Sequence, residues 1–274
     1  MPDVAVVVAA YNAEATIREA VESVLSAKVD CVVYVVDDCS RVLANEVLHG
    51  LSDRIVFIRM EQNSGPAAAR NAALELILQS DFKYVAILDA DDISAPGRLE
   101  KQAAFLDAHP DVGACGSYMR EFHEVTGETI RIFKRPAAPD DVRDIMFFNM
   151  GVNHASAMIR TDALRKVGLY SLDYKAAEDY ELMRRIGTHY KLANIPECLV
   201  HYRISSRGQS HRLRRRQVYE RMLVQLKYFE ISQWRAWAGI ARSFAAMIAP
   251  PRIMQAGEAA RAARGSANEL PLPR

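Results

Sequence analysis

The amino-acid sequence predicts an α/β fold built around a mostly parallel sheet. Two patterns in the first hundred residues lead to this prediction. Short apolar runs rich in valine and isoleucine alternate with segments whose apolar residues recur at helical spacing. The apolar runs are continuous, which is typical of strands covered by helices on both faces. Ligands of such sheets bind beyond the carboxyl ends of the strands, so we expect the functional residues there.

The first seven elements follow this alternation. An apolar stripe indicates the first helix, and Pro66 suits the first turn of the third. In chain order, we expect a strand at Val4–Ala9, a helix at Ala15–Ser26, a strand at Val32–Val36, a helix at Val42–Leu51, a strand at Ile55–Ile58, a helix at Gly65–Gln79 and a strand at Tyr84–Leu88.

The chain is less regular after Pro110. Further short strands and one helix are expected at Val112–Gly116, Ile130–Phe133, Ala155–Ile159, Glu178–Ile186 (the helix), Lys191–Ala193 and Leu199–Tyr202. From His211 to about Ile248 the pattern is helical, basic and aromatic. We therefore divide the chain into a main domain at 1–210 (halves 1–115 and 116–210), a basic amphipathic segment at 211–250 and a flexible tail at 251–274.

The composition is that of an ordinary globular protein. The chain has 274 residues, of which 50% are hydrophobic and 25% charged, and this excludes a disordered, collagen-like or disulfide-scaffold protein. No run reaches the ~18–20 apolar residues of a spanning helix. The N-terminus enters an apolar strand at once, so we expect a cytoplasmic protein. Four scattered cysteines predict free thiols: Cys31, Cys39, Cys115 and Cys198.

Charge is distributed unevenly along the chain. The formal net charge is +1, but residues 201–274 carry a net +10 and the first 200 residues a net −9. An acidic body with a basic C-terminal segment calls for an explanation in terms of binding partners.

Polar residues follow the predicted strands at the edge where ligands are expected. The first strand leads into Tyr11-Asn12, the second into Asp37-Asp38 and the fourth into Asp89-Ala90-Asp91-Asp92. Carboxylates spaced as Asp-x-Asp are hard oxygen ligands for Mg²⁺ or Mn²⁺, which commonly bind through one or two carboxylates and substrate phosphates. The sequence therefore predicts a cation site in this crevice.

Three other nucleotide- or phosphate-related folds do not fit. The chain has neither the G-x-x-x-x-G-K-[ST] phosphate loop nor a G-x-G-x-x-G after its first strand. A receiver domain needs an aspartate after its third strand, where this chain has Arg59-Met60-Glu61.

The order of motifs resembles glycosyltransferase family 2, whose members have a GT-A fold. This fold is a Rossmann-like, mostly parallel sheet with a mixed acceptor-side extension. The matching segments run from residue 3 to about 210: Val6–Glu14, Tyr34–Ser40, Asn63–Asn71, Leu88–Asp92, Asn153–Tyr170, Ala177–Tyr180 and Tyr202-Arg203.

The resemblance implies a nucleotide-sugar-dependent, inverting transferase. Tyr11 would stack on the base, Asp38 would accept the N3–H of uracil or thymine, and Asp89 would contact the ribose. Asp91, with Asp89, would hold Mn²⁺ or Mg²⁺. The implied donor-contacting residues are Ala9, Tyr11, Glu14, Asp38, Arg70, Asp89, Ala90 and Arg203.

The implied general base is Asp179, which would deprotonate the acceptor hydroxyl. It lies at the predicted start of a helix, where the dipole favours an ionised carboxylate. The chain departs from the family in two places. Cys39 stands where a glycine is frequent, so a turn with positive φ would be strained there. Ser205 stands where a histidine is frequent, which leaves Arg203 as the contact of that loop.

Two other functions are weighed against a UDP-sugar transferase in bacterial surface or exopolysaccharide synthesis. One is an inactive GT-A-like binding subunit, against which the presence of all four acids, Asp38, Asp89, Asp91 and Asp179, argues. The other is nucleic-acid binding through the basic run 212–216, which the acidic body disfavours, so no nucleic-acid partner is expected. The sequence names neither the sugar nor the acceptor, and it does not separate UDP from dTDP.

The segment 211–250 has the composition of a peripheral membrane helix. A basic cluster precedes aromatic and aliphatic residues, and Arg235 and Arg242 interrupt the apolar run. Cationic aromatic helices of this kind lie in the bilayer interface, which would suit a glycan acceptor carried on a lipid at the inner face of the cell membrane. The alternatives are packing on the main domain or a homodimer contact.

Overall fold

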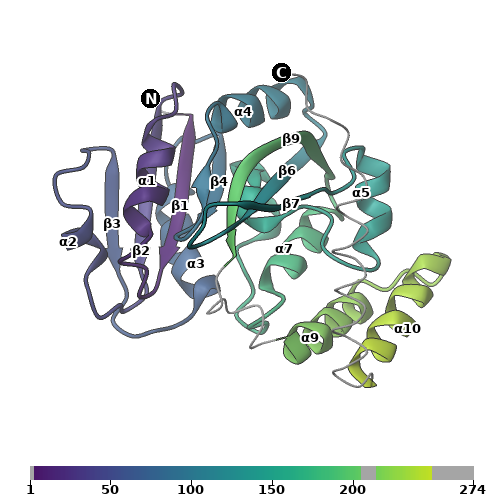
Figure 1. Cartoon of the computed structure of the whole chain (residues 1–274). Helices are drawn as coiled ribbons and strands as arrows, with labels where there is room; N and C mark the ends of the chain where they lie inside the picture. Colours follow the sequence, from purple (N-terminus) through teal and green to yellow (C-terminus); the bar gives the residue numbers. More distant parts are fainter. Residues whose placement is uncertain (1–2, 205–213, 249–274) are drawn as a thin grey trace.

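A computed structural model describes residues 3–204 and 214–248 of the chain. Its N-terminal half contains four parallel strands in the order β3-β2-β1-β4 (Figure 1). They are β1 (Val4–Ala10), β2 (Cys31–Asp37), β3 (Ile55–Arg59) and β4 (Tyr84–Asp89). Each agrees with its predicted range to within a residue at either end, so the predicted parallel half is confirmed.

Three helices connect these strands. They are α1 (Ile17–Leu25), α2 (Ala44–Val47) and α3 (Pro66–Ile77). The prediction of a helix over Val42–Leu51 is wrong in length, since α2 has a single turn. Gly50 lies at φ +72°, a left-handed conformation that ends helical structure.

Helices cover both faces of the sheet, as the continuous apolar runs predicted. Along β1, Ala5 and Val7 belong to the core cluster on the side of α3, whereas Val4, Val6 and Val8 belong to the cluster on the side of α1. All five residues are fully buried.

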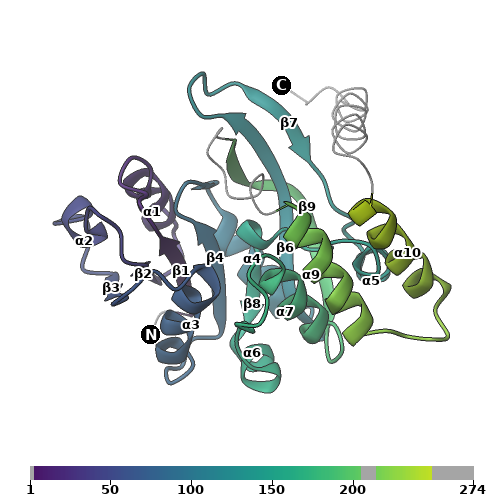
Figure 2. The ribbon, with the colours of Figure 1, turned by 90° about the horizontal axis from the view of Figure 1, so that it is seen from below.

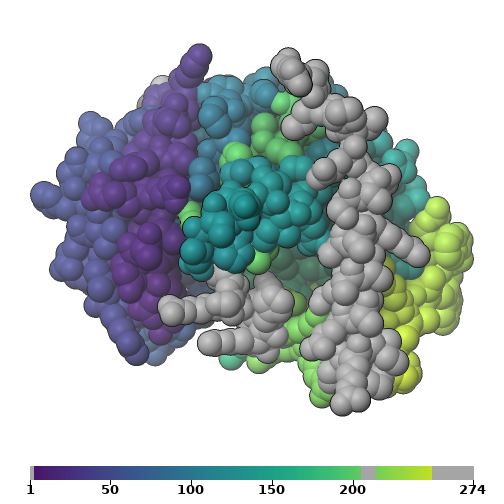
Figure 3. All heavy atoms as spheres, viewed as in Figure 1, coloured from purple at the N-terminus to yellow at the C-terminus, as the bar shows by residue number. Residues whose placement is uncertain are grey.

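The sheet continues from β4 as a mixed extension in the order β8-β6-β9-β5, and β7 pairs with β6. These strands are β5 (Ile93–Ser94), β6 (Val112–His123), β7 (Thr129–Phe133), β8 (Met158–Arg160) and β9 (Lys191–Ile204). In the space-filling view the teal β6–β7 residues lie beside the purple N-terminal elements (Figure 3).

Three strand predictions in this half need correction. β6 extends seven residues beyond the predicted end at Gly116, and β9 is one strand where two were expected. Pro196 lies in an irregularity of the β6–β9 ladder between the pairs Ser117–Ile195 and Tyr118–Cys198, so the break seen in the sequence is only a bulge. The predicted strand at Ala155–Ile159 starts instead as a 3-10 helix, η1 (His154–Ser156), before β8.

Helix α7 (Glu178–Ile186) has its predicted bounds, but three other helices were not predicted. They are α4 (Arg98–Ala108), α5 (Pro139–Met146) and α6 (Thr161–Val167). The buried face of α4 includes Arg98 and Gln102, and these polar core residues hide the apolar periodicity.

The predicted helical segment near the C-terminus forms two helices, α9 (Arg214–Lys227) and α10 (Trp234–Ile248). Figures 1 and 2 show α9 between α7 and α10, with α10 outermost. No helix of residues 3–204 and 214–248 is long and apolar enough to cross a membrane. Ser205, the proposed boundary at 210 and the tail 251–274 lie outside the described residues.

Candidate active site

The carboxyl ends of β2, β1 and β4 are neighbours in the sheet. The register places Ala10 of β1 opposite Asp37 of β2, and it places Ala9 opposite Asp89 of β4. The polar segments after these strands therefore leave the sheet at one edge, where the sequence predicted a crevice.

The loops that follow β1 and β2 are tied together. The Asn12 N–H donates to Ser40 Oγ (2.9 Å), and the Arg41 N–H donates to Asn12 Oδ1 (2.9 Å). Tyr11 is 48% exposed beside these contacts, so its ring can be reached by a ligand. Ala9 is half-buried and Glu14 is exposed on the way to α1; the donor contacts of all three remain predictions.

Cys39 adopts a left-handed conformation, with φ +64°. This is the conformation expected at a position where the family frequently has glycine. For a residue with a Cβ this costs about 1 kcal/mol.

We therefore expect Cys39→Gly to raise the free energy of unfolding by about 0.5–1 kcal/mol, measured by urea denaturation. Cys39→Ala keeps the Cβ and serves as the control. Equal stability of the two variants would show that the turn is unstrained.

Asp37 holds the loop after β2 in place. Its carboxylate accepts the N–H of Ser40 (2.8 Å) and of Ala44 (3.0 Å), and it pairs with Arg59 Nη1 (2.6 Å). Burial opposes ionisation, but these hydrogen bonds outweigh it and lower the pKa of Asp37. This acid therefore has a structural task.

Asp38 is buried and fixes the loop that leads into α3. Its two carboxylate oxygens accept the N–H groups of Ser64 and Gly65, each at 2.8 Å. Its carbonyl accepts a hydrogen bond from Asn63 Nδ2 (3.2 Å). A carboxylate oxygen has two lone pairs, so these bonds leave room for a base N–H. That contact remains a prediction.

Arg70 of α3 joins the end of β4 to the start of α7. Its Nη2 lies 2.9 Å from Asp89 Oδ1, its Nη1 lies 3.5 Å from Glu178 Oε1, and its guanidinium stacks over the Tyr170 ring (5.8 Å). Burial acts to lower the pKa of Arg70, but the surrounding acids raise it overall, so the cation is retained. The chain thus brings residues that are about a hundred positions apart into one charged cluster.

The loop after β4 is braced from two sides. Thr16 Oγ1 donates to the Ala90 carbonyl (2.9 Å). From β9, the Arg203 N–H donates to Asp92 Oδ1 (2.9 Å), and Arg203 Nε donates to the Asp91 carbonyl (2.8 Å). The predicted donor contact Arg203 therefore supports the acidic loop directly, with its Nη2 also paired to Glu19 of α1.

Asp89 and Asp91 have the chemistry of a site for Mg²⁺ or Mn²⁺. The Asp91 side chain reaches solvent, yet partial desolvation and the charge of Asp89 raise its pKa to about 6. This repulsion is one that a bound cation would relieve. In residues 3–204 and 214–248 no group of three or more His, Cys, Asp or Glu side chains could hold a metal alone. The pair therefore fits a cation whose other ligands are phosphate and water.

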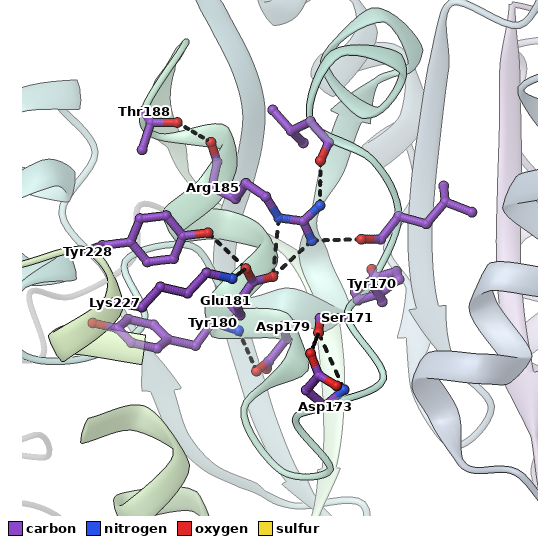
Figure 4. A network of polar contacts seen from close by, with 12 residues as sticks. Tyr170, Ser171, Asp173, Asp179, Tyr180, Glu181, Arg185, Thr188, Lys227 and Tyr228 are labelled. Carbon is purple, nitrogen blue, oxygen red and sulfur yellow. Dashed lines mark hydrogen bonds and ion pairs between the residues drawn. The ribbon is translucent and has the colours of Figure 1, made fainter. Parts of the chain in front are cut away.

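Asp179 lies in the first turn of α7, where three acids meet the positive end of the helix dipole. Its Oδ1 accepts the Tyr180 N–H (2.6 Å; Figure 4). Burial and the charge of Glu178 raise the pKa of Asp179 to about 7, against the opposing pull of this N–H and of Arg70. The carboxylate is therefore poised to exchange a proton near neutral pH.

Three residues of this cluster were not singled out as site residues from the sequence. Asn71 clamps Tyr170 in both directions: Nδ2 donates to the Tyr170 carbonyl (2.9 Å), and Oδ1 accepts its N–H (3.0 Å). His154 Nε2 lies 2.7 Å from Tyr170 Oη. Burial and Arg70 hold the pKa of His154 well below its usual range, so the ring is neutral. All three lie within the segments matched to the family, Asn63–Asn71 and Asn153–Tyr170, but no spacing marks His154 as a site residue.

A second buried group lies behind the acidic loop. Asp92 and Arg98 are almost fully buried, and Arg98 donates to Gln102 Oε1 (2.9 Å) and to the Ile87 carbonyl (2.7 Å). Burial lowers the pKa of Arg98 to about 10. These hydrogen bonds of Arg98 fix the end of β4. The sequence does not reveal this role, because an Arg-x-x-x-Gln spacing is common on exposed helices.

Two cavities of the described chain do not include Asp89, Asp91 or Asp179 in their lining. One of about 320 Å³ lies at the amino end of β4, lined by residues that include Lys83, Asp107 and Arg160. The other, of about 250 Å³, is lined by residues that include Asp37 and Phe57. The acidic edge is the candidate site because of the chemistry of its carboxylates.

Comparisons with known proteins identify the family of the chain. The profile of Glycosyl transferase family 2 matches residues 5–168. An uncharacterised glycosyltransferase of Methanocaldococcus jannaschii is 31% identical over 227 residues, which cover 80% of this chain and 77% of that protein. The amylovoran biosynthesis glycosyltransferase AmsE of Erwinia amylovora is 32% identical over 153 residues, 56% of this chain and 55% of AmsE.

Solved structures show the same fold. S. aureus TarS in complex with UDP-GlcNAc superimposes with a TM-score of 0.68 at 19% identity, over 89% of this chain and 72% of that one. The mannosyltransferase PcManGT of Pyrobaculum calidifontis, in complex with GDP-Man and Mn²⁺, gives 0.65 at 20% identity, over 98% and 77%. The parallel half, the mixed extension and the C-terminal helices together are therefore a GT-A-like fold, and the chain belongs to glycosyl transferase family 2.

Proposed function

We propose that the protein transfers a sugar from a UDP-sugar to an acceptor hydroxyl, with inversion and with a divalent cation. The observation that carries this proposal is the Arg70 bridge. It holds Asp89, on the donor side, and Glu178, the neighbour of Asp179, in one cluster. A displacement at the anomeric carbon needs a leaving-group site and a base in this relation.

The residues suggest a single displacement. Tyr11 would stack on the base, while Asp89 would position the ribose. The acceptor oxygen would then form a bond to the anomeric carbon as its proton passes to Asp179. The bond from that carbon to the diphosphate oxygen breaks, and the nucleoside diphosphate leaves with the electron pair. Attack and departure on opposite faces invert the configuration.

Asp91 and Asp89 would hold Mn²⁺ or Mg²⁺. A cation there supplies positive charge to the diphosphate as negative charge develops on it. Arg203, which braces the carbonyl of Asp91, keeps this loop in place.

Similar proteins support a nucleotide-sugar donor and a role in polysaccharide synthesis. The TarS complex contains UDP-GlcNAc, whereas PcManGT binds GDP-Man with Mn²⁺. Relatives include AmsE and the succinoglycan biosynthesis protein ExoO of Rhizobium meliloti. We favour a UDP-sugar, because Asp38 would accept the N3–H of uracil, and a role in bacterial surface or exopolysaccharide synthesis, with a glycan or lipid-linked acceptor.

A donor panel tests this function. The full chain is incubated with Mn²⁺ and with UDP-, dTDP- and GDP-sugars, and donor binding is measured by calorimetry alongside nucleotide release. We expect binding and slow release of UDP from one UDP-sugar, because water replaces the missing acceptor. Binding without release, even with polysaccharide or lipid acceptors, would indicate a binding subunit. Absence of donor binding would refute the proposal.

A further inference from the structure

We infer that α10 docks the protein on the surface of an anionic lipid bilayer. The inference concerns location and does not depend on the proposed chemistry. One face of α10 carries an apolar stripe of four residues: Trp234, Trp237, Phe244 and Ile248. They would enter the interfacial layer, with arginines at its flank contacting lipid phosphates.

One face of α10 is already used for packing on the protein. Its buried residues are small: Ala236, Gly239 and Ser243. A Cβ on Gly239 would lie 2.0 Å from the Phe147 carbonyl oxygen, so the helix sits directly on the chain there. Ser243 Oγ donates to Gln225 Oε1 of α9 (2.8 Å). The orientation of α10 is therefore fixed by contacts of its small residues.

The opposite face carries the large apolar side chains. The stripe residues recur at helical spacing and are exposed by 66%, 57%, 52% and 67%, in chain order. The ring of Trp237 is oriented by an edge contact with Phe229 (4.7 Å between centroids) and by donation from its Nε1 to the Ile231 carbonyl (3.2 Å). Tryptophans in an exposed stripe suit the membrane–water interface, where a ring can be half apolar and half hydrated.

Cations adjoin this face. Arg235 and Arg242, seven residues apart, share one flank of α10, and the helix has no acidic residue. Arg235 Nη2 pairs with Asp144 Oδ2 of α5 (2.9 Å), so Arg242 is the cation of this flank on which the inference rests. Arg242 lies near Arg135, which follows β7. Burial and the charges of Arg131 and Arg242 lower the pKa of Arg135 to about 10. In the described part of the chain, Arg135 contacts neutral partners, Asn153 Oδ1 (3.2 Å) and the Phe133 ring (4.7 Å). Arg131 pairs with Glu121 (2.6 Å), so a phosphate here would chiefly offset the charges of Arg135 and Arg242.

Helix α9 connects α10 rigidly to the candidate active site. Glu181 of α7 is fully buried and accepts hydrogen bonds from Lys227 Nζ and Tyr228 Oη, both at 2.8 Å (Figure 4). The buried Glu220 of α9 accepts the N–H of Ala176, just before α7 (2.7 Å). A bilayer bound by α10 would therefore hold the helix of Asp179 at a fixed orientation.

A bilayer fits the stripe better than a second copy of the chain does. A symmetric contact between two α10 helices would bring Arg242 of both copies together. The helix has no acid, and the nearby Asp144 already pairs with Arg235 of its own copy. An anionic surface instead attracts the basic C-terminal segment, whose net charge is +10 over residues 201–274.

The two tryptophans of the chain make a direct test, since both belong to the stripe. The full-length protein is mixed with vesicles of phosphatidylcholine alone or with phosphatidylglycerol. We expect emission to shift to shorter wavelength only with the anionic vesicles, and brominated lipid to quench it. A shift that depends on protein concentration without vesicles would indicate dimerisation instead. Tryptophans already shielded from acrylamide without vesicles would indicate coverage by the chain itself. Either result overturns the inference.

Variants separate insertion from charge attraction. Trp234→Ser/Phe244→Ser should weaken vesicle sedimentation at least about tenfold, whereas Val125→Ser/Leu172→Ser, at exposed sites elsewhere, should not. Arg242→Gln should weaken it about fivefold and reduce its salt dependence, whereas Lys101→Gln on α4 changes the net charge equally and should not. Matching thermal unfolding of all variants excludes misfolding as the cause. Equal loss in each pair would refute a specific docking face.

Discussion

Replacing Asp179 by asparagine should lower kcat by roughly 10²–10⁴-fold while leaving the Kd of the donor nearly unchanged. Asparagine keeps the size of the side chain and can still accept the Tyr180 N–H through its amide oxygen. It cannot accept the proton of the acceptor hydroxyl at neutral pH. Donor binding should survive because the Arg70 bridge runs through Glu178 and Asp89, not through Asp179. Steady-state kinetics and calorimetric donor titration measure the two quantities.

The pH dependence of the same reaction provides an internal check. The pKa of Asp179 is raised to about 7, and the base works only when ionised. The rate should therefore fall about tenfold per unit as the pH drops below this value, and it should level off above it. In Asp179→Asn this dependence should disappear. Asp173→Asn, at an exposed site on the preceding loop, should retain both rate and profile. An Asp179→Asn enzyme with normal turnover would show that the base lies elsewhere.

Asp91→Ala should reduce turnover by at least about 10³-fold, because under the proposed mechanism the variant loses a ligand of the cation that would neutralise the leaving diphosphate. EDTA should inactivate the unmodified protein to the same extent, and added Mn²⁺ should restore it. The variant should not respond to Mn²⁺ at concentrations that saturate the unmodified protein. Removal of the acid also relieves its repulsion with Asp89, so the fold should not be destabilised.

Asp53→Asn is the matched control, since it removes a carboxylate from an exposed loop at the other end of the sheet. Its turnover and response to EDTA should equal those of the unmodified protein. Full activity in EDTA after exhaustive dialysis would contradict a metal-dependent mechanism, although transfer by Asp179 could then still hold.

Local sequence patterns determined the parallel half of the fold. Continuous β-branched runs specify strands buried on both faces, and a strand followed by a helix specifies a parallel neighbour. Acids placed directly after such strands, as Asp38 and Asp89 are, must therefore emerge at one edge. The bounds of α7 were also predictable, because its first turn is acidic and its last turn basic.

The tertiary structure decided what depends on contacts between distant segments. Pairing with β6 carries β9 past Pro196, although a proline by itself predicts a break. Arg70 has no local signal for bridging Asp89 and Glu178, since only the tertiary fold brings α3, the end of β4 and the start of α7 together. The sequence of α10 fits an exposed helix as well as a packed one. Its small residues contact Phe147 and α9, and this packing is what turns the tryptophans outward, because a helix can bury only one face against its neighbour.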